Sequence, residues 1–467
     1  MNIIKKIKQK IGPSQDYKFK TMKLDKQSIT LIFNETLTNS ITINDFILRE
    51  LKNIKKQELN NLDIYLPNTN IIEIKKQDIL DNLNNGCLII ITKNKIYSIE
   101  VKIILDRGVT TIQSELSITG PKDSFTENYN TNINLIRKRL KTTNLYCENI
   151  TMGKNTKTKV GILYMNNIIN KHLPKLVKEK LSSIDIDGII DSSYLKRSLE
   201  NKSLFPTIML TERPDKSVMA LLEGKIIIIV DMSPYALILP SFFIDFFHTT
   251  DDYYQKNLNV SFIRLIRLFA FIIAIFTPAI YIATTTRNYN LLSYDLLMML
   301  KAGRSFVPFP AYIEAMFMII CFEILKETDF RMSTTAGSAV SILGGLILGD
   351  AAVSAGIVSP IMIIVIAISS IAGLIFPSIE LGNALRSYKI LLLILSTILG
   401  IYGVIIGGIY LLYELITTKT FTYNYLTPFI PYEQNEIKDS IIKLKNNKRN
   451  KKLTNNITRG KNIWKKY

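Results

Sequence analysis

The sequence predicts an α/β, two-lobed cytoplasmic N-terminal domain followed by an α-helical transmembrane domain. Short strand-like runs alternate with helical patterns over residues 45–255. Long apolar stretches dominate after that point, and residues 351–379 contain no charged side chain at all. Because a helix needs only about 20 apolar residues to cross a bilayer, these stretches indicate membrane spans.

The composition agrees with a chain that is divided in this way. A mean hydropathy of +0.18 is high for a protein in which 21% of the residues are charged. The net charge of +19 fits Lys and Arg held in cytoplasmic segments and beside anionic lipid. No aromatic–basic motif indicates nucleic-acid binding. Three scattered cysteines and two histidines predict no disulfide framework, no metal site, no cofactor and no catalytic residue.

Shifts in composition divide the chain into five parts. These are a basic, weakly patterned N-terminal segment (1–44), a first α/β lobe (45–112), a second α/β lobe (113–255), a multi-span membrane domain (256–418) and a basic cytoplasmic tail (419–467). The basic N-terminus lacks an apolar core of signal-peptide length, so we expect the lobes to stay in the cytoplasm. From Glu433 onward, 11 Lys or Arg stand against 3 acidic residues, which predicts the same side for the tail.

Alternating patterns place the main elements of the two lobes. Residues 86–92 and 95–103 are typical of two strands joined by a tight turn. A helix is expected after Pro121, with Ser124 or Thr126 as its N-cap. Further elements are a strand at 158–165, helices at 166–182 and 191–200, and a strand–turn–strand at 225–239.

Five apolar segments make up the predicted membrane domain. They lie at 268–286, 308–326, 332–357, 361–376 and 390–413. With both chain ends in the cytoplasm, the number of full crossings is even, so we expect about four spans plus one interfacial or re-entrant segment. The exception is expected to be the segment 308–325 or the pair over 338–376 that Pro360 interrupts.

One helix with regularly spaced small residues is the main functional candidate. Helix-packing residues recur in it at four-residue steps: Gly337, Ser341, Gly345 and Gly349. Asp350 follows directly and is one of three intramembrane carboxylates, with Glu314 and Glu323. The two glutamates are nine residues apart, so a helix would direct them to nearly opposite faces.

Several sequence blocks, taken in order, resemble the GerA family, the A-type subunits of spore germinant receptors in endospore-forming Firmicutes. The blocks are ELSITGPKDSFTENYNTNINLIRKRLK (115–141), FPTIMLTERPD (205–215), LLEGKIIIIVDMSPYALILPSFF (221–243), VPFPAYIEAMFMIICFEILKE (307–327) and SAVSILGGLILGDAAVSAGIVSPIMIIVIA (338–367). The similarity extends over about 100–430 and is looser at both ends.

The resemblance implies a non-enzymatic subunit that triggers spore germination in response to nutrients. It implies residence in the spore inner membrane, among its lipids, with B-type (transporter-like) and C-type (lipoprotein) partners. Copies of the A chain would form a homo-oligomeric ring around a ligand-gated cation path over 345–366. The pore-lining or gating candidates are Gly345, Gly349, Asp350, Val353, Ile357, Ile361 and Ile364. The branched apolar members would form a constriction that gates by dewetting, and Asp350 would attract cations.

This sequence departs from the family pattern at a few places. Gly349–Asp350 stands where Gly–Gln is expected, Ser354 replaces a common acidic residue, and Met232–Ser233 replaces Gly–Thr. The charge of the pore is therefore left open. Two alternatives also stay open: a non-conducting scaffold that couples a germinant sensor to another channel, and the related membrane protein of the stage V sporulation operon. An enzyme or solute transporter has less support, because the sequence shows no phosphate loop, metal cluster, catalytic triad or evident inverted repeat.

Overall fold

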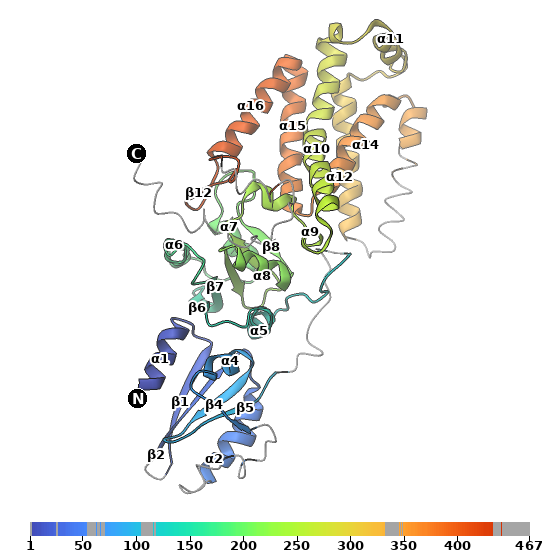
Figure 1. Ribbon diagram of the computed structural model, residues 1–467. Helices are drawn as coiled ribbons and strands as arrows, with labels where there is room; N and C mark the ends of the chain where they lie inside the picture. Colours follow the sequence, from blue (N-terminus) through green and yellow to red (C-terminus); the bar gives the residue numbers. More distant parts are fainter. Residues whose placement is uncertain are drawn as a thin grey trace, which may run out of the picture. The chain divides into compact units, whose positions relative to one another are not determined.

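The computed structural model describes residues 2–432, with gaps, together with Ser440. The gaps are 25–26, 54–70 apart from Leu62 and Leu66, 104–117 apart from Glu115, and 332–348 apart from Gly345 and Ile347. The described residues form two compact units (Figure 1). Of the described residues, the sheet unit contains the chain up to Glu200 and Ile208–Ser241, and the helical unit contains Asn201–Thr207 and those from Phe242 onward.

The first sheet of the sheet unit has five antiparallel strands in the order β1-β2-β4-β5-β3. They are β1 (Tyr17–Leu24), β2 (Gln27–Asn34), β3 (Ile71–Glu73), β4 (Cys87–Ile91) and β5 (Ile96–Glu100). Successive side chains of β4 point to opposite faces. Leu88 and Ile90 join the apolar core under η1 (Thr42–Leu48) and α2 (Arg49–Asn53), whereas Ile89 joins the core under α1 (Asn2–Ile11) and α4 (Ile79–Asn84).

This sheet corrects the predicted division of the chain at residue 44. The stretch 1–44 is not a segment apart from the first lobe, because it supplies α1 and two of the five strands. β1 and β2 pair from Tyr17–Asn34 to Leu24–Gln27. Lysines alternate with apolar residues along β1, and this basic character hides the strand pattern in the sequence. The predicted pair of strands over 86–103 is confirmed as β4 and β5.

The second sheet has the strand order β6-β7-β9-β10-β8, again antiparallel. Its strands are β6 (Leu145–Met152), β7 (Thr158–Met165), β8 (Met209–Thr211), β9 (Ile226–Val230) and β10 (Ala236–Leu239), and its helices are α5 (Tyr129–Arg139), α6 (His172–Ser182), α7 (Ser192–Leu199) and α8 (Pro214–Leu222). The predicted strand at 158–165 and the strand–turn–strand at 225–239 are confirmed.

The predicted N-cap of α5 is wrong by a few residues. Asn128 caps the helix, and its side chain accepts hydrogen bonds from the backbone N–H groups of Asn130 and Thr131. Thr126 instead donates its backbone N–H to Asn132 Oδ1 at 2.7 Å. The turn before the helix is therefore tied to the helix body, and the chain enters α5 later than the sequence suggests.

A buried ion pair joins residues of the two lobes within the sheet unit. Arg137 of α5 is 1% exposed and forms an ion pair with Asp16, which precedes β1. The guanidinium also donates to the Leu145 carbonyl at 3.1 Å. Asn34 donates to the same Asp16 carboxylate at 3.0 Å. Such a pair stabilises a fold only while both partners are present, because either charge alone is costly to bury.

The helical unit is built around α10 (Figure 1). Its main helices are α10 (Asn257–Ile282), α11 (Tyr294–Ala302), α12 (Ala311–Arg331), α14 (Pro360–Leu374), α15 (Ile379–Leu399) and α16 (Ile401–Thr417). Short elements complete it: η3 (Phe243–Phe247), α9 (Asp251–Tyr254), η4 (Ala283–Arg287), η5 (Tyr289–Leu291), β11 (Lys419–Thr420) and β12 (Tyr423–Asn424). α10 packs against α14 and α15, α12 against α14, and α15 against α16.

Two described helices are long and apolar enough to cross a membrane, namely Asn257–Arg287 and Ile379–Leu399. α14 and α16 are apolar but shorter. Most of the exposed large apolar side chains of the described chain lie on the helical unit. Contiguous exposed apolar surface of this kind is typical of membrane or protein interfaces.

The predicted single segment over 390–413 is wrong, because the chain turns back at Gly400. This residue has φ of +61°, a conformation that favours glycine, and it separates α15 from α16. The two helices pack antiparallel, with Tyr388 of α15 bonded to Glu414 of α16. A Cβ at Gly403 would lie 2.1 Å from the Leu395 carbonyl oxygen, so glycine allows this close approach.

We predict that Arg137→Ala lowers the stability of the sheet unit by about 3–5 kcal/mol, because it leaves the Asp16 carboxylate buried without its counter-ion. Differential scanning calorimetry of the purified full chain measures the change. Arg139→Ala is the matched control, since Arg139 lies on the same helix but its ion pair with Asp123 is about one quarter exposed. The control should cost less than about 1 kcal/mol. Equal losses in the two variants would contradict the assigned role of the buried pair.

Candidate functional site

The predicted pore segment contains a helical stretch, a tight turn and a second helix. Its described helical residues are Gly345, Ile347 and 349–354, and Gly356 then turns the chain with φ of +66°. A Cβ at Gly356 would lie 3.1 Å from the Phe306 carbonyl oxygen, so the turn lies close against another backbone segment. Ser359 is the N-cap of α14 and Pro360 occupies its first turn. Pro360 therefore begins a new helix, since proline suits the first turn and breaks a helix interior.

The helical stretch has one face toward the core of the unit and one face away from it. Ala352 is buried in a cluster with residues of α12 and α14. A Cβ at Gly345 would lie 3.9 Å from Leu325 of α12. The opposite stripe is exposed and contains Ile347, Asp350 and Ser354. Several predicted pore residues therefore lie on a surface that the described part of this chain leaves open.

The remaining candidates lie at different depths around this surface. Ile357 and Ile364 are 38% and 57% exposed, and Val353 and Ile361 are half-buried. A Cβ at Gly349 would have no heavy atom within 4 Å. The helix-packing candidates Gly337 and Ser341 lie outside the described residues.

Asp350 is an exposed carboxylate on an otherwise apolar surface. No cation of the described chain lies within ion-pair distance of it. The structure does not bring it together with Glu314 or Glu323, which have partners of their own. An uncompensated carboxylate on such a surface is costly in lipid and calls for water or a second protein surface beside it.

Glu314 links three segments of the helical unit through an ion pair and a hydrogen bond. Its side chain is fully buried and pairs with Arg304 through Nη2 at 2.9 Å and Nε at 3.2 Å. Its second oxygen accepts the backbone N–H of Ser359 at 3.0 Å. The carboxylate thus holds the N-terminus of α14, where the helix dipole favours a negative charge.

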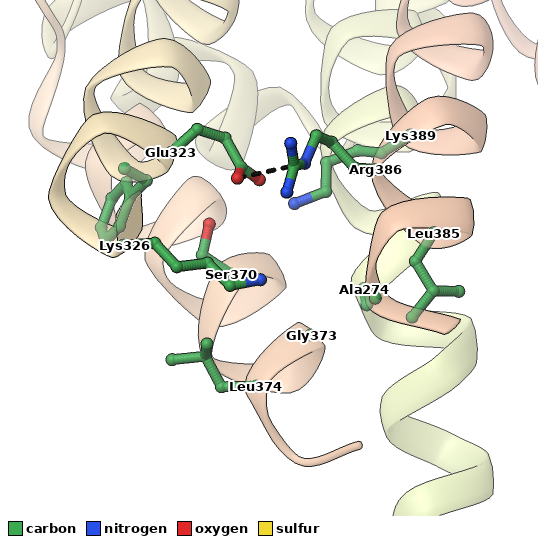
Figure 2. Close-up of a pocket in the computed structure, with 11 residues that line it drawn as sticks. Ala274, Glu323, Lys326, Ser370, Gly373, Leu374, Leu385, Arg386 and Lys389 are labelled. Atoms are coloured by element: carbon green, nitrogen blue, oxygen red, sulfur yellow. Dashed lines mark ion pairs between the residues drawn. The ribbon is translucent and has the colours of Figure 1, made fainter. Parts of the chain in front are cut away.

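Glu323 lines a partly open cavity of about 60 Å³ (Figure 2). It forms an ion pair with Arg386 of α15, with 3.1 Å between Oε2 and Nε. Lys326 and Lys389 line the same cavity. The prediction that the two glutamates of α12 point to different surroundings agrees with this arrangement. The local sequence around Arg304 and Arg386 does not mark them as partners of distant carboxylates, and that around the two lysines does not mark them as lining one cavity.

A second buried charge cluster lies at the start of α10. Asp252 accepts hydrogen bonds from Arg267 Nη1 at 2.9 Å and from Arg264 Nε at 3.2 Å, and all three residues are buried. Burial alone would raise the pKa of Asp252, but Arg267, His248 and Arg264 outweigh it and lower that pKa. The two arginines are three residues apart and therefore share one helix face, and this spacing in the sequence indicates a common partner.

His248 belongs to the same cluster. Its Nε2 lies 2.8 Å from the Ser440 carbonyl oxygen, which the neutral ring can satisfy by donating a proton. Burial, followed by the charge of Arg264, lowers the pKa of His248 to about 3. Within the described residues, no three His, Cys, Asp or Glu side chains are grouped so that they could hold a metal ion.

We predict that Glu314→Gln destabilises the helical unit by about 3 kcal/mol or more, since Arg304 then loses the counter-ion that compensates its partial burial. The thermal midpoint of the full chain in detergent measures this loss. Glu323→Gln makes the same chemical change in an ion pair whose side chains are 29% and 40% exposed, and should cost less than Glu314→Gln does. An unchanged midpoint for Glu314→Gln would show that the contacts of Glu314 with Arg304 and Ser359 do not stabilise the unit.

The pKa of His248 also predicts a pH dependence of stability. A neutral buried histidine stabilises the fold fully above pH 6.5, and this stability is lost as the pH falls from 6.5 toward 3, because only the unfolded chain then binds the proton. The slope is at most about 1.4 kcal/mol per pH unit. Denaturation midpoints between pH 7 and 4.5, above the range in which Asp252 titrates, measure it. His248→Gln should flatten the slope, and His172→Gln, at the exposed second histidine, should not. A slope that persists in His248→Gln would rule out this assignment.

Comparison with known proteins confirms the resemblance noted in the sequence. A sequence profile of the Bacillus/Clostridium GerA spore germination proteins matches residues 5–454. Spore germination protein KA of Bacillus subtilis (strain 168) is 33% identical over 456 residues, which cover 94% of this chain and 84% of that protein. Spore germination protein GerQA of Bacillus cereus is 35% identical over 446 residues, covering 93% of this chain and 89% of that protein.

One solved structure is also similar. The crystal structure of the N-terminal domain of the A subunit of the Bacillus megaterium spore germinant receptor GerK3 aligns with 51% of this chain and 94% of its own chain, at 28% identity and a TM-score of 0.39. The sequence matches extend through both units, from the first sheet to the last helices. The chain therefore belongs to the GerA family of spore germination proteins.

Proposed function

We propose that this chain is the A-type subunit of a nutrient-germinant receptor and that its copies form a gated cation path in the spore inner membrane. Its relatives are spore germination proteins, and their similarity extends over nearly the whole chain. The proposal includes B-type and C-type subunits as partners and assigns no enzymatic activity. The apolar helices of the helical unit would lie in the membrane, since two of them have the length and composition of spans.

The single observation that carries the cation path is the exposed stripe around Asp350. The stripe combines one carboxylate without a cation partner in the described chain with neighbouring exposed apolar residues such as Ile347 and Ile357. A lipid-facing carboxylate is costly, whereas a carboxylate that meets its own copies around a wet axis is hydrated and attracts cations. Cyclic symmetry would repeat the carboxylate around that axis.

The apolar residues next to Asp350 would form the gate in this proposal. Val353, Ile357, Ile361 and Ile364 follow the carboxylate along the chain, and two of them are clearly exposed. A ring of such side chains closes a pore by excluding water without a covalent plug. The turn at Gly356 lies between the carboxylate and most of this apolar surface, so a change at the turn would alter both together.

A scaffold without its own pore is the second candidate, and one contact favours it. Gly345 packs toward Leu325 of the same chain, so one of the regularly spaced small residues serves packing within the chain. Gly349 does not share that contact, because a Cβ there would meet no heavy atom within 4 Å. Gly345 therefore supports the scaffold and Gly349 is compatible with the pore, while the exposed carboxylate of Asp350 favours the pore.

We predict that Asp350→Asn slows potassium release from germinating spores by about tenfold, the lower end of the concentrating effect of a charged pore. Val353→Phe should block release by filling the proposed constriction. The spores would carry this chain together with its B-type and C-type partner genes, and flame photometry would follow potassium after germinant addition. Asp295→Asn, which neutralises an exposed carboxylate on α11, is the matched control and should release potassium normally.

The outcomes separate the two candidates. Normal release by both Asp350→Asn and Val353→Phe, at normal protein levels, would reject the pore assignment to this segment. The scaffold would then be tested by the oligomeric state of the purified complex. A monomer or dimer of the A chain without a central opening supports the scaffold, whereas a closed ring with Asp350 on its axis supports the pore.

A further inference from the structure

The cavity between α12, α14 and α15 has an excess of positive charge. Four ionisable side chains line it: the carboxylate Glu323 and the cations Lys326, Arg386 and Lys389. One negative charge against three positive charges leaves a net charge of +2 at the cavity. Arg386 is the ion-pair partner of Glu323, so the two lysines make up the excess.

Lys389 is largely buried beside this cavity and forms no ion pair with the described residues. The residue is only 7% exposed. In the part of the chain that the structure describes, no carboxylate lies within 4.0 Å of its ammonium group and no hydrogen-bond acceptor is in reach. Figure 2 shows its side chain extending beside Arg386 toward the side of the cavity that Glu323 occupies. Glu323 is the only carboxylate among the four charged residues of the lining, and it is already paired with Arg386. A largely buried lysine with so little compensation is costly, which favours an occupant that supplies negative charge.

Small residues keep the cavity open. Gly373 of α14 and Gly382 of α15 line it, together with the hydroxyl-bearing Ser370. A Cβ at Gly373 would have no heavy atom within 4 Å, and one at Gly382 would lie 3.9 Å from Lys326 Nζ. The volume of about 60 Å³ holds about two waters, and the partly open mouth lets a larger molecule place one charged group inside.

The position of the cavity along the helices also points to an anion. Glu323 and Lys326 end the apolar run of α12, and Arg386 and Lys389 precede the apolar run of α15. The cavity therefore lies where the polar ends of two helices meet their apolar parts. In a membrane-embedded helical unit this boundary is the headgroup level, where anionic phosphates are concentrated.

We propose that this cavity binds a phosphate or carboxylate oxyanion, with Lys389 and Lys326 as its charged ligands and the Ser370 hydroxyl within its lining. The oxyanion would be either the headgroup of an anionic lipid or a free anion from the aqueous phase. Its binding would link α12, α14 and α15 through one shared charge. The inference does not depend on whether the chain forms a pore, since none of these residues belongs to the proposed pore stripe.

The test uses the full chain in nanodiscs of neutral phosphatidylcholine. In one arm, equilibrium binding of radiolabelled inorganic phosphate is measured. In the other arm, phosphatidylglycerol is added to the discs, and native mass spectrometry counts the lipid that the protein retains. Binding in the first arm identifies a free anion, and binding only in the second arm identifies a lipid headgroup.

Four variants make the test specific to the cavity. Lys389→Met removes the buried charge and should weaken binding by about tenfold or more. Gly373→Leu leaves all four charges in place but fills the cavity, and should weaken binding as well. Lys389→Arg keeps the charge and should retain binding. Lys301→Met removes an exposed lysine of α11 and should bind like the wild type.

A stability measurement distinguishes this role from a structural one. Without added anion, Lys389→Met should raise the thermal midpoint, because it removes an uncompensated buried charge. With saturating anion, the wild type should gain stability and the variant should not. The proposal is overturned if neither anion binds, if Lys389→Met and Gly373→Leu bind as the wild type does, or if Lys389→Met lowers the midpoint without anion.

Discussion

A charge that leaves water must be compensated, and this constraint organises the helical unit. Glu314 meets Arg304 and the N-terminus of α14, and Asp252 meets Arg264 and Arg267. Glu314 contacts Ser359 at the start of α14, and Asp252 contacts two arginines of the helix that follows it in the chain. The same electrostatic requirement therefore fixes how the apolar helices pack, although apolar contacts between helices are largely interchangeable.

Asp350 and Lys389 depart from this rule. Asp350 is exposed on an apolar surface, and Lys389 is buried beside a cavity. Neither forms an ion pair with the described residues. Departures from a rule that the rest of the unit obeys are where function is expected, because a fold does not retain such costs for stability alone. The two sites differ in the group that would compensate them. Water or a second protein surface would do so for Asp350, and a small anion would do so for Lys389.

The sequence predicted local structure where a short periodic pattern decides it. The strands at 158–165 and 225–239 were predictable because alternating apolar runs and turn residues specify them without reference to the rest of the chain. The first two strands were missed because lysines alternate with the apolar residues of β1. The N-cap of α5 was misplaced because Thr126, a good cap by type, bonds to Asn132 instead.

The candidate site was predictable only in part. Asp350 and the apolar residues after it follow from intramembrane charge and from family resemblance, both of which are sequence properties. The partners of Glu314 and Glu323 lie on other elements and become visible only when the chain is folded. The cation excess around Lys389 likewise arises from α12 and α15 together, and neither helix alone shows it.

The turn at Gly400 changes the arithmetic of the chain's path. It splits one apolar segment into two antiparallel helices, α15 and α16. By length and composition α15 could cross a membrane, whereas α16 is shorter. In the membrane arrangement proposed above, a chain that leaves along α15 comes back along α16, so one residue with left-handed backbone geometry adds a reversal of direction that a single helix over 390–413 would not have.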